Sequence, residues 1–143
     1  MNRPFAILFF LFIAMSCSST SCKRKETIET KFSRLVNTWK LIKTGTDDNG
    51  NGAVDASEIH LVQEGLDDEL VFTKEYTGKE TVIINGVTTE YPFTWKKDDN
   101  DTLTRDGIGH NTIKYHIDVI SSVSLQLSTN TTLGNAAYIY NKK

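Results

Sequence analysis

The feature that most constrains the fold is a run of short alternating segments that fills the second half of the chain. From residue 69 onward, apolar and polar residues alternate in stretches that are separated by turn-forming residues. The pattern is most regular in residues 112–119, where Ile113, Tyr115 and Ile117 alternate with polar side chains. Alternation with a period of two is typical of strands with one buried face and one solvated face. These segments therefore predict a mainly β domain.

The dipeptide Asn85-Gly86 indicates how two of these strands are joined. It lies between residues 80–84 and residues 87–96, which both have strand character. Both central residues of a type I′ turn need a positive φ, which Asn and Gly adopt at low cost, so a β-hairpin is predicted here. Further strands are expected in these segments: 38–43, 69–73, around Leu103, 112–119, 122–128 and 136–140. About eight strands at this spacing favour a small antiparallel up-and-down barrel or a sandwich.

Residues 47–58, DDNGNGAVDASE, have the spacing of an EF-hand calcium loop. A calcium ion takes about six to eight oxygen ligands, which a loop supplies from alternate short side chains and from a final bidentate Glu. Gly52 occupies the position of the sharp turn, where a positive φ is required. The expected ligands are the side chains of Asp47, Asn49, Asn51, Asp55 and Glu58, together with the carbonyl of Ala53.

The alternative for this segment is an ordinary surface turn, because Asp, Asn and Gly are common in turns. An ordinary turn does not need the aliphatic Val54 or the closing Glu58, so the sequence favours calcium. The loop follows a predicted strand, and only its exit, residues 56–63, has helical character. We therefore expect a structural site in the weak extracellular range, with a dissociation constant of about 10⁻⁴ to 10⁻³ M.

The first 16 residues read as an export signal, with Arg3 ahead of an apolar run from Phe5 to Met15. The segment that ends at Cys17 resembles the lipobox of bacterial lipoproteins, which implies that Cys17 carries the lipid. Cys22 is the alternative lipidated residue, and a disulfide between the two cysteines is a further alternative. Residues 17–25 would then be a lipidated tether, and the expected location is the cell envelope, at the outer membrane.

Residues 26–143 are expected to form one domain. The spacing of Ile28, Phe32 and Leu35 predicts a short helix within residues 26–36, ahead of the first strand. The remaining length is enough for a single hydrophobic core. The whole chain has a formal net charge of −2, so it offers no basic surface for nucleic acid.

The order of these elements resembles the lipocalin-like lipoproteins of Bacteroidetes over residues 36–143. The motifs that carry the resemblance follow in this order: Thr38-Trp39-Lys40-Leu41, the Asp-rich insertion, Leu70-Val71-Phe72, Phe93-Thr94-Trp95, Asp101-Thr102-Leu103, Ile117-Asp118-Val119-Ile120 and Leu125-Gln126-Leu127. Where the family has Gly before this Trp, the chain has Thr38. The resemblance implies a small lipocalin-like barrel with an apolar interior and without catalytic residues.

Aromatic side chains are the candidates for a ligand pocket in such a barrel. They are Trp39, Phe72, Tyr91, Phe93, Trp95 and Tyr115. A barrel of eight strands can hold one small ligand, but its interior can also be filled by its own side chains. The small size of this domain favours the filled core.

The sequence does not indicate an enzyme. It has three histidines, His60, His110 and His116, which do not share a motif, and it lacks the HExxH, nucleophile-elbow and phosphate-loop patterns. We therefore expect a non-catalytic, calcium-binding envelope lipoprotein that acts as a binding or interaction module. Its expected partners are the membrane, through the lipid, and an envelope protein or glycan. The alternative is a carrier or sequestering protein for a small apolar ligand inside the barrel.

Overall fold

The computed structural model describes residues 28–98, 100–107, 112–132 and 134–143. The predicted signal and tether, with Cys17 and Cys22, and His110 lie outside the described residues. The elements are α1 (Ile28–Leu35), β1 (Thr38–Thr46), the 3₁₀ helix η1 (Ala56–Glu58), β2 (Ile59–Leu61), β3 (Leu66–Phe72), β4 (Thr77–Ile84), β5 (Val87–Lys97), β6 (Thr102–Gly107), β7 (Ile113–Ile120), β8 (Ser124–Thr131) and β9 (Gly134–Lys142).

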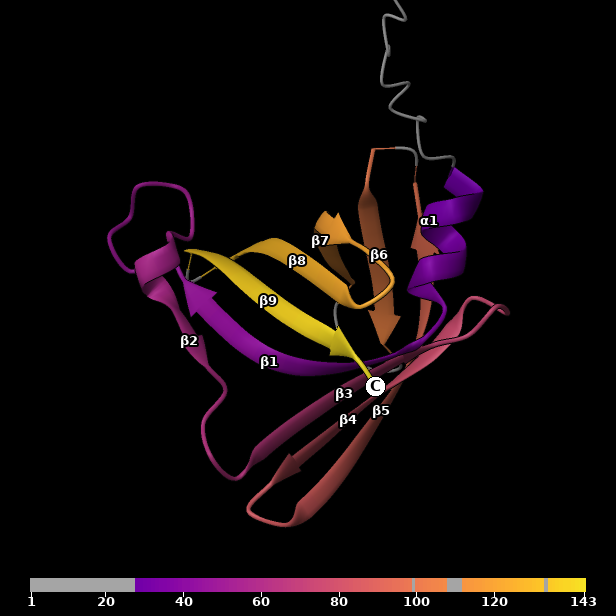
Figure 1. The fold of residues 1–143 in the computed structure, drawn as a ribbon, viewed down its shortest axis with the longest axis horizontal. Helices are drawn as coiled ribbons and strands as arrows, with labels where there is room; N and C mark the ends of the chain where they lie inside the picture. The colour runs from indigo at the N-terminus through magenta and orange to yellow at the C-terminus, as the bar shows by residue number, and fades with distance from the viewer. Residues whose placement is uncertain (1–27, 99, 108–111, 133) are drawn as a thin grey trace, which may run out of the picture.

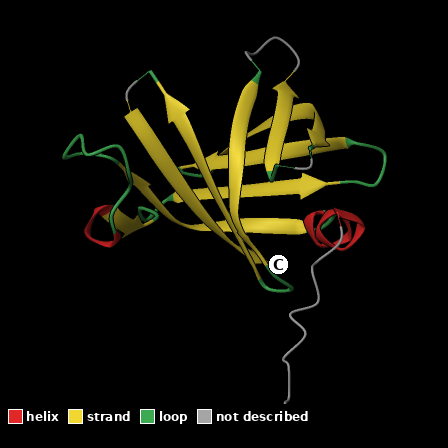
Figure 2. Cartoon of the chain, turned by 90° about the horizontal axis from the view of Figure 1, so that it is seen from above, coloured by secondary structure: helices red, strands yellow, loops and turns green. Residues whose placement is uncertain are grey.

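The strands form a closed antiparallel barrel, as predicted. β1 and β3 to β9 pair in sequence order, and β9 pairs back with β1 from Trp39↔Lys142 to Thr46↔Ala136. The short strand β2 pairs with the same edge of β1 as β3 does, at a different height. Figure 1 shows β1 and β9 side by side, and Figure 2 shows α1 and the 3₁₀ helix at opposite ends of the molecule.

The predicted hairpin at Asn85-Gly86 is confirmed. Asn85 has a φ of 51° and Gly86 a φ of 81°, and the flanking residues Ile84 and Val87 are paired. Inside this hairpin, Gly78 faces Phe93 across the β4–β5 pair. A Cβ atom on Gly78 would overlap the Phe93 ring, so the glycine makes room for that aromatic side chain. The hairpin therefore follows the turn chemistry of the sequence closely.

The predicted helix over residues 56–63 is wrong. Helical structure there is limited to the single 3₁₀ turn of Ala56–Glu58, and Ile59–Leu61 form β2. The register places Lys43 opposite Leu61 and Gly45 opposite Ile59. This part of the β1 edge lies beyond the end of its pairing with β3, so β2 satisfies backbone groups that a helix would leave unpaired.

Aromatic residues and the helix close one end of the barrel. Trp39 is fully buried, and its Nε1 donates a hydrogen bond of 2.9 Å to the carbonyl of Leu35 at the end of α1. The ring of Phe32 stacks on that of Trp95 with centroids 5.3 Å apart, and Phe72 meets Trp95 edge-on with centroids 5.5 Å apart. Such aromatic pairs stabilise the fold by more than the burial of their apolar area alone. This end is therefore a packed core.

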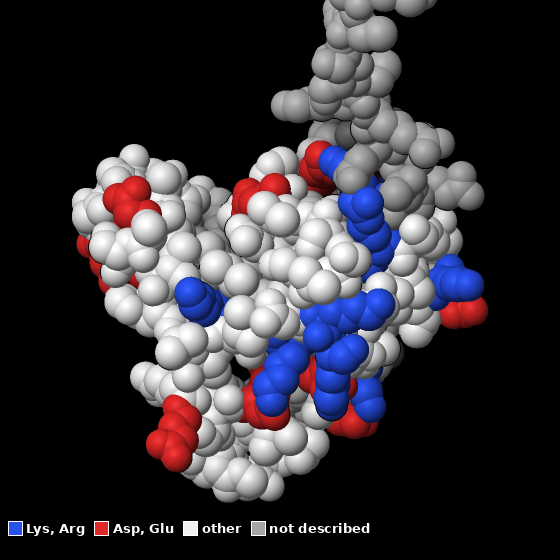
Figure 3. Space-filling view, in the orientation of Figure 1, with Lys and Arg blue, Asp and Glu red and all other residues white. Residues whose placement is uncertain are grey.

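The outer surface carries ion pairs that join segments distant in sequence. Lys40 of β1 lies 2.8 Å from Asp67 of β3, and Lys143 lies 2.5 Å from Glu69. Figure 3 shows basic and acidic side chains close together on this face. Exposed pairs of this kind contribute little to stability. Within the described ranges, no helix has the length and hydropathy that a membrane span requires.

Candidate functional site

The strand order of the barrel is closed, but its wall has an opening where the β4–β5 hairpin separates from β6. β4 and β5 stay paired out to Ile84 and Val87, whereas β5 pairs with β6 only from Phe93 to Lys97. Pro92, which has no N–H to donate, therefore lies just beyond this second pairing. Figure 1 shows the hairpin extending away from β6 and β7. A cavity of about 490 Å³ lies at this point and is lined by Glu80, Tyr91, Pro92, Phe93, Arg105, Gly107 and Ile113.

The alternation of strands β5 and β6 turns Tyr91, Phe93 and Arg105 toward the barrel interior. Tyr91 shares a strand face with Phe93, and Arg105 shares one with the fully buried Leu103. Phe93 is buried, while Tyr91 is 38% exposed. The cavity wall therefore runs from the core to the solvent, with aromatic side chains along it.

Arg105 is the central polar side chain of this cavity. It is only 7% exposed, and its Nη2 donates a hydrogen bond of 2.6 Å to Oε2 of Glu80. Its guanidinium carbon lies 4.3 Å from the centre of the Phe93 ring, a cation–π arrangement. Burial acts to lower the pKa of Arg105, but the neighbouring Tyr115 and Glu80 raise it above its ordinary value. The side chain is thus a permanent cation inside the barrel.

Asp68 of β3 belongs to the same interior cluster. Burial, with repulsion from Glu80, raises its pKa to about 7, and Arg105 partly opposes this shift. Oδ1 of Asp68 and Nε of Arg105 are buried and have no hydrogen-bond partner among the described residues. Because the folded state binds this proton more tightly than the unfolded state does, Asp68 makes stability fall as the pH rises from about 4 to about 7.

Three tyrosines complete the interior around these charges. Burial raises the pKa of Tyr115 to about 12 and raises those of Tyr138 and Tyr140. The Tyr115 and Tyr138 rings meet edge-on, with centroids 6.1 Å apart. All three side chains therefore stay neutral at physiological pH, and the charges of this interior layer belong to Asp68 and to the Arg105–Glu80 pair.

The structure divides the six predicted pocket residues. Tyr91 and Phe93 line the open cavity, and Phe93 is also part of the buried core. Trp39, Phe72 and Trp95 lie in the closed core. The remaining residue, Tyr115, is a buried core residue that lies beside Arg105.

Sequence analysis did not identify Asp68, Glu80 or Arg105 as site residues. A signal was present for two of them, because Arg105 lies two residues after Leu103 and Asp68 two residues before Leu70. In a strand, this spacing puts a charge on the same face as a buried leucine. The pairing of Arg105 with Glu80 could not be inferred, because the two strands are separated by β5.

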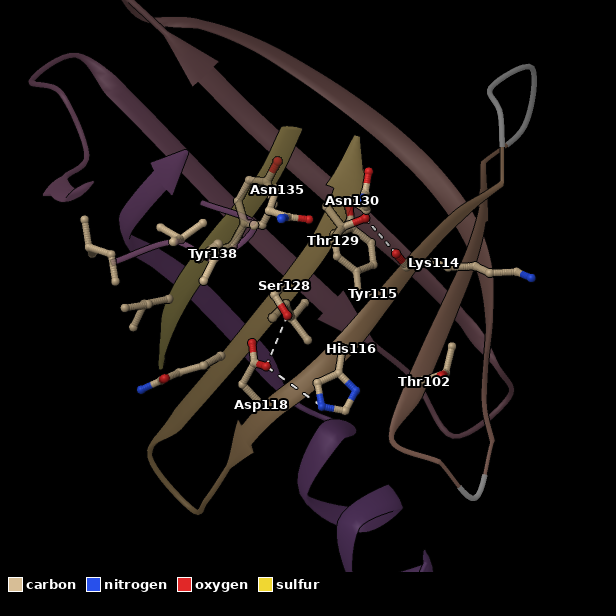
Figure 4. Close-up of a pocket in the computed structure, with 18 residues that line it drawn as sticks. Thr102, Lys114, Tyr115, His116, Asp118, Ser128, Thr129, Asn130, Asn135 and Tyr138 are labelled. Carbon is tan, nitrogen blue, oxygen red and sulfur yellow. Dashed lines mark hydrogen bonds and ion pairs between the residues drawn. The ribbon is translucent and has the colours of Figure 1, made fainter. Parts of the chain in front are cut away.

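A second hollow, of about 700 Å³, lies between the 47–58 loop and the outer side of β7 to β9. Its lining includes loop residues Gly52–Val54 and the exposed side chains of His116 and Asp118. Figure 4 shows that Asp118 contacts both Ser128 and His116. Ser128 donates to Asp118 Oδ1 at 3.1 Å, and Nε2 of His116 lies 3.9 Å from the same oxygen.

This trio does not have the order of a hydrolase triad. In a triad, the histidine lies between the hydroxyl and the carboxylate so that it can remove the hydroxyl proton. Here the carboxylate of Asp118 lies between Ser128 and His116. His60 is exposed on β2, away from this group. The arrangement therefore provides no activated nucleophile.

The 47–58 loop is folded around two of its carboxylates. Asp47 accepts hydrogen bonds from the backbone N–H groups of Asn51, at 3.0 Å, and Gly52, at 2.9 Å. Glu58 is 8% exposed and accepts from the N–H groups of Asp48, Asn49 and Asp55. Gly52 has a φ of 90°, as its turn position requires.

Asp55 lies across the same loop, where its Oδ2 accepts hydrogen bonds from the side-chain amides of Asn49 and Asn51. The predicted side-chain ligands are thus linked to one another or to the loop backbone. Within the described residues, however, no three His, Cys, Asp or Glu side chains form a group arranged to hold a metal ion. The calcium site therefore stays a prediction.

Comparison with known proteins places the fold. No protein-family model matches the chain, and no curated protein matches its sequence. A solved lipocalin-like protein from Bacteroides uniformis has a TM-score of 0.56 and 13% identity, over 77% of this chain and 99% of that one.

More distant likenesses are found among animal proteins. Bovine odorant-binding protein in complex with undecanal has a TM-score of 0.49 and 18% identity, over 83% of this chain and 77% of that one. Lobster apocrustacyanin A1 has a TM-score of 0.48 and 9% identity, over 78% of this chain and 62% of that one. The closed barrel and its likeness to the Bacteroides structure show that this chain has a lipocalin-like fold.

Proposed function

We propose that this protein binds a small, largely apolar molecule in the open cavity of its barrel and acts as a carrier or sequestering protein. The observation that carries the proposal is the cavity of about 490 Å³ between the β4–β5 hairpin and β6. Its size falls within the range of about 300 to 1,000 Å³ that is common for small-ligand sites. Tyr91, Phe93 and Ile113 supply apolar walls.

The predicted calcium loop is the second candidate site. The observation in its favour is the closing position of Glu58, whose buried carboxylate holds the backbone at both ends of the loop. If calcium binds, the side chains of Asp47, Asn49, Asn51, Asp55 and Glu58 and the Ala53 carbonyl would hold it. Its role would be to stabilise the loop that borders the outer hollow. Lipidation at Cys17 and a place in the cell envelope likewise remain predictions, and they would present this carrier at a membrane.

Ligand binding can be measured with N-phenylnaphthylamine, an uncharged apolar fluorescent probe. We expect saturable fluorescence enhancement by the purified chain. Tyr91→Ala removes an aromatic wall that is partly open to solvent, so it should weaken probe binding by about tenfold. Val123→Ala removes an exposed apolar side chain from a residue that does not line this cavity, so it should leave binding unchanged. A wild-type protein that does not enhance fluorescence, or equal losses in the two variants, would contradict the proposal.

Calcium binding can be measured as a shift in melting temperature between calcium and chelator. With a dissociation constant of about 10⁻⁴ M, millimolar calcium stabilises the fold by about 1.4 kcal/mol, which is several degrees for a domain of this size. Glu58→Gln should remove most of this difference, because the amide replaces the bidentate carboxylate. Glu64→Gln, at an exposed position after the loop, is the matched control and should keep it. Identical melting curves of the wild type in calcium and in chelator would exclude a site of this strength.

A further inference from the structure

The barrel interior beside the open cavity carries an unequal set of charges. Among the described residues of this layer, the titratable groups are Asp68, Glu80, Arg105, Tyr115, Tyr138 and Tyr140. The three tyrosines are neutral at physiological pH, so two carboxyl groups face one guanidinium. Arg105 is already paired with Glu80, and Oδ1 of Asp68 has no hydrogen-bond partner among the described residues. The layer is therefore neutral or negative, depending on the state of Asp68.

The two members of the ion pair are not equally accessible to a ligand. The Glu80 side chain is 23% exposed, whereas the Arg105 side chain is 8% exposed. Oε2 of Glu80 holds Arg105, and its other oxygen, Oε1, can accept a further hydrogen bond. A molecule that enters between Tyr91 and Ile113 thus meets a negatively charged hydrogen-bond acceptor in the cavity wall, opposite Tyr91.

We infer that this barrel selects amphipathic molecules whose polar head is an uncharged hydrogen-bond donor, such as an alcohol, and that it discriminates against carboxylates such as fatty acids. This inference rests on the proposed ligand-binding function. A hydroxyl can donate to Glu80 while its alkyl chain lies along Tyr91 and Phe93. A carboxylate head has no hydrogen to donate, and it would meet the negative charge of Glu80, which already holds Nη2 of Arg105.

The comparison of two ligands with the same tail, dodecanol and dodecanoate, tests this inference. Each displaces N-phenylnaphthylamine from the purified chain at pH 8, where Asp68, with a pKa of about 7, is mostly ionised. We expect dodecanol to bind at least tenfold more tightly than dodecanoate. Glu80→Gln removes one negative charge and releases Arg105 from its ion pair, so the preference for the alcohol should fall at least tenfold.

Asp68→Asn provides a second variant in case Glu80→Gln does not fold. Asp68 holds no hydrogen bond through Oδ1, and burial disfavours its charged form relative to the unfolded chain, so an uncharged replacement is compatible with the fold. We expect this variant also to reduce the preference for dodecanol.

The outcomes separate this inference from the proposed function. If dodecanol and dodecanoate displace the probe equally well, or dodecanoate does so better, the barrel binds ligands but the selectivity proposed above is wrong. If the preference for dodecanol is the same in wild type and in every folded variant, the acidic groups do not cause it and the inference is likewise wrong. If the probe itself does not bind, both the proposed function and the inference fail.

Discussion

Replacing Arg105 by Met is expected to lower the free energy of unfolding by about 3 kcal/mol at pH 8, because removal of one partner from a buried ion pair leaves the other charge uncompensated. Glu80 would lose its 2.6 Å hydrogen bond, and Phe93 would lose the guanidinium over its ring. Urea unfolding followed by circular dichroism measures the change. Without Arg105 to oppose it, the pKa of Asp68 should rise further, and this lowers stability only at pH values where Asp68 is ionised in the wild type. At pH 6 Asp68 is mostly protonated in both proteins, so the loss should be smaller.

Two further variants show whether this loss comes from the charges. Arg105→Met combined with Glu80→Gln should recover about half of it or more, because the uncompensated carboxylate is gone. Lys96→Met removes a cation from the exposed side of the adjacent strand and should change stability by about 0.5 kcal/mol or less. Equal stability of wild type and Arg105→Met at pH 8 would show that the buried pair does not stabilise the barrel.

Trp39→Ala is expected to have the largest effect, a loss of about 4 kcal/mol, because it opens a cavity in the closed end of the barrel. Trp39 is completely buried, with an exposed fraction of 0%, and its side chain donates a hydrogen bond to the Leu35 carbonyl of α1. The same urea titration measures the effect. Trp39→Phe keeps most of the packing but leaves that carbonyl without its donor, so it should lower the free energy of unfolding by about 1 to 3 kcal/mol. A loss below about 1 kcal/mol for Trp39→Ala would mean that this end is not the stabilising core.

The sequence was sufficient to predict the barrel because its strands depend on local patterns. The alternation in β7 and the Asn85-Gly86 turn both follow from the preferences of adjacent residues, and both are present in the structure. The helix predicted after the loop failed because a tertiary contact decided the outcome. Residues Ile59–Leu61 pair with an edge of β1 that is visible only once the barrel is assembled.

The candidate site was harder to predict for the same reason. Tyr91 and Phe93 could be named from their aromatic character alone, although sequence could not separate them from Trp39 and Trp95, which have the same character and lie in the core. The difference is set by where β5 leaves β6, which depends on strand lengths and register. The partnership of Arg105 with Glu80 joins strands that are not neighbours in the sheet, so it depends on the assembled sheet and not on adjacent residues.

The pairing of the first and last strands also has a consequence for how the chain reaches its native state. Thr46 and Ala136 are partners although almost the whole domain separates them in sequence. Contacts between such distant residues are slow to form, because a long loop must be ordered first. During synthesis, the edge of β1 that faces β9 has no partner until residues 134–142 have left the ribosome, so the nascent barrel passes through an open form that can pair with other chains.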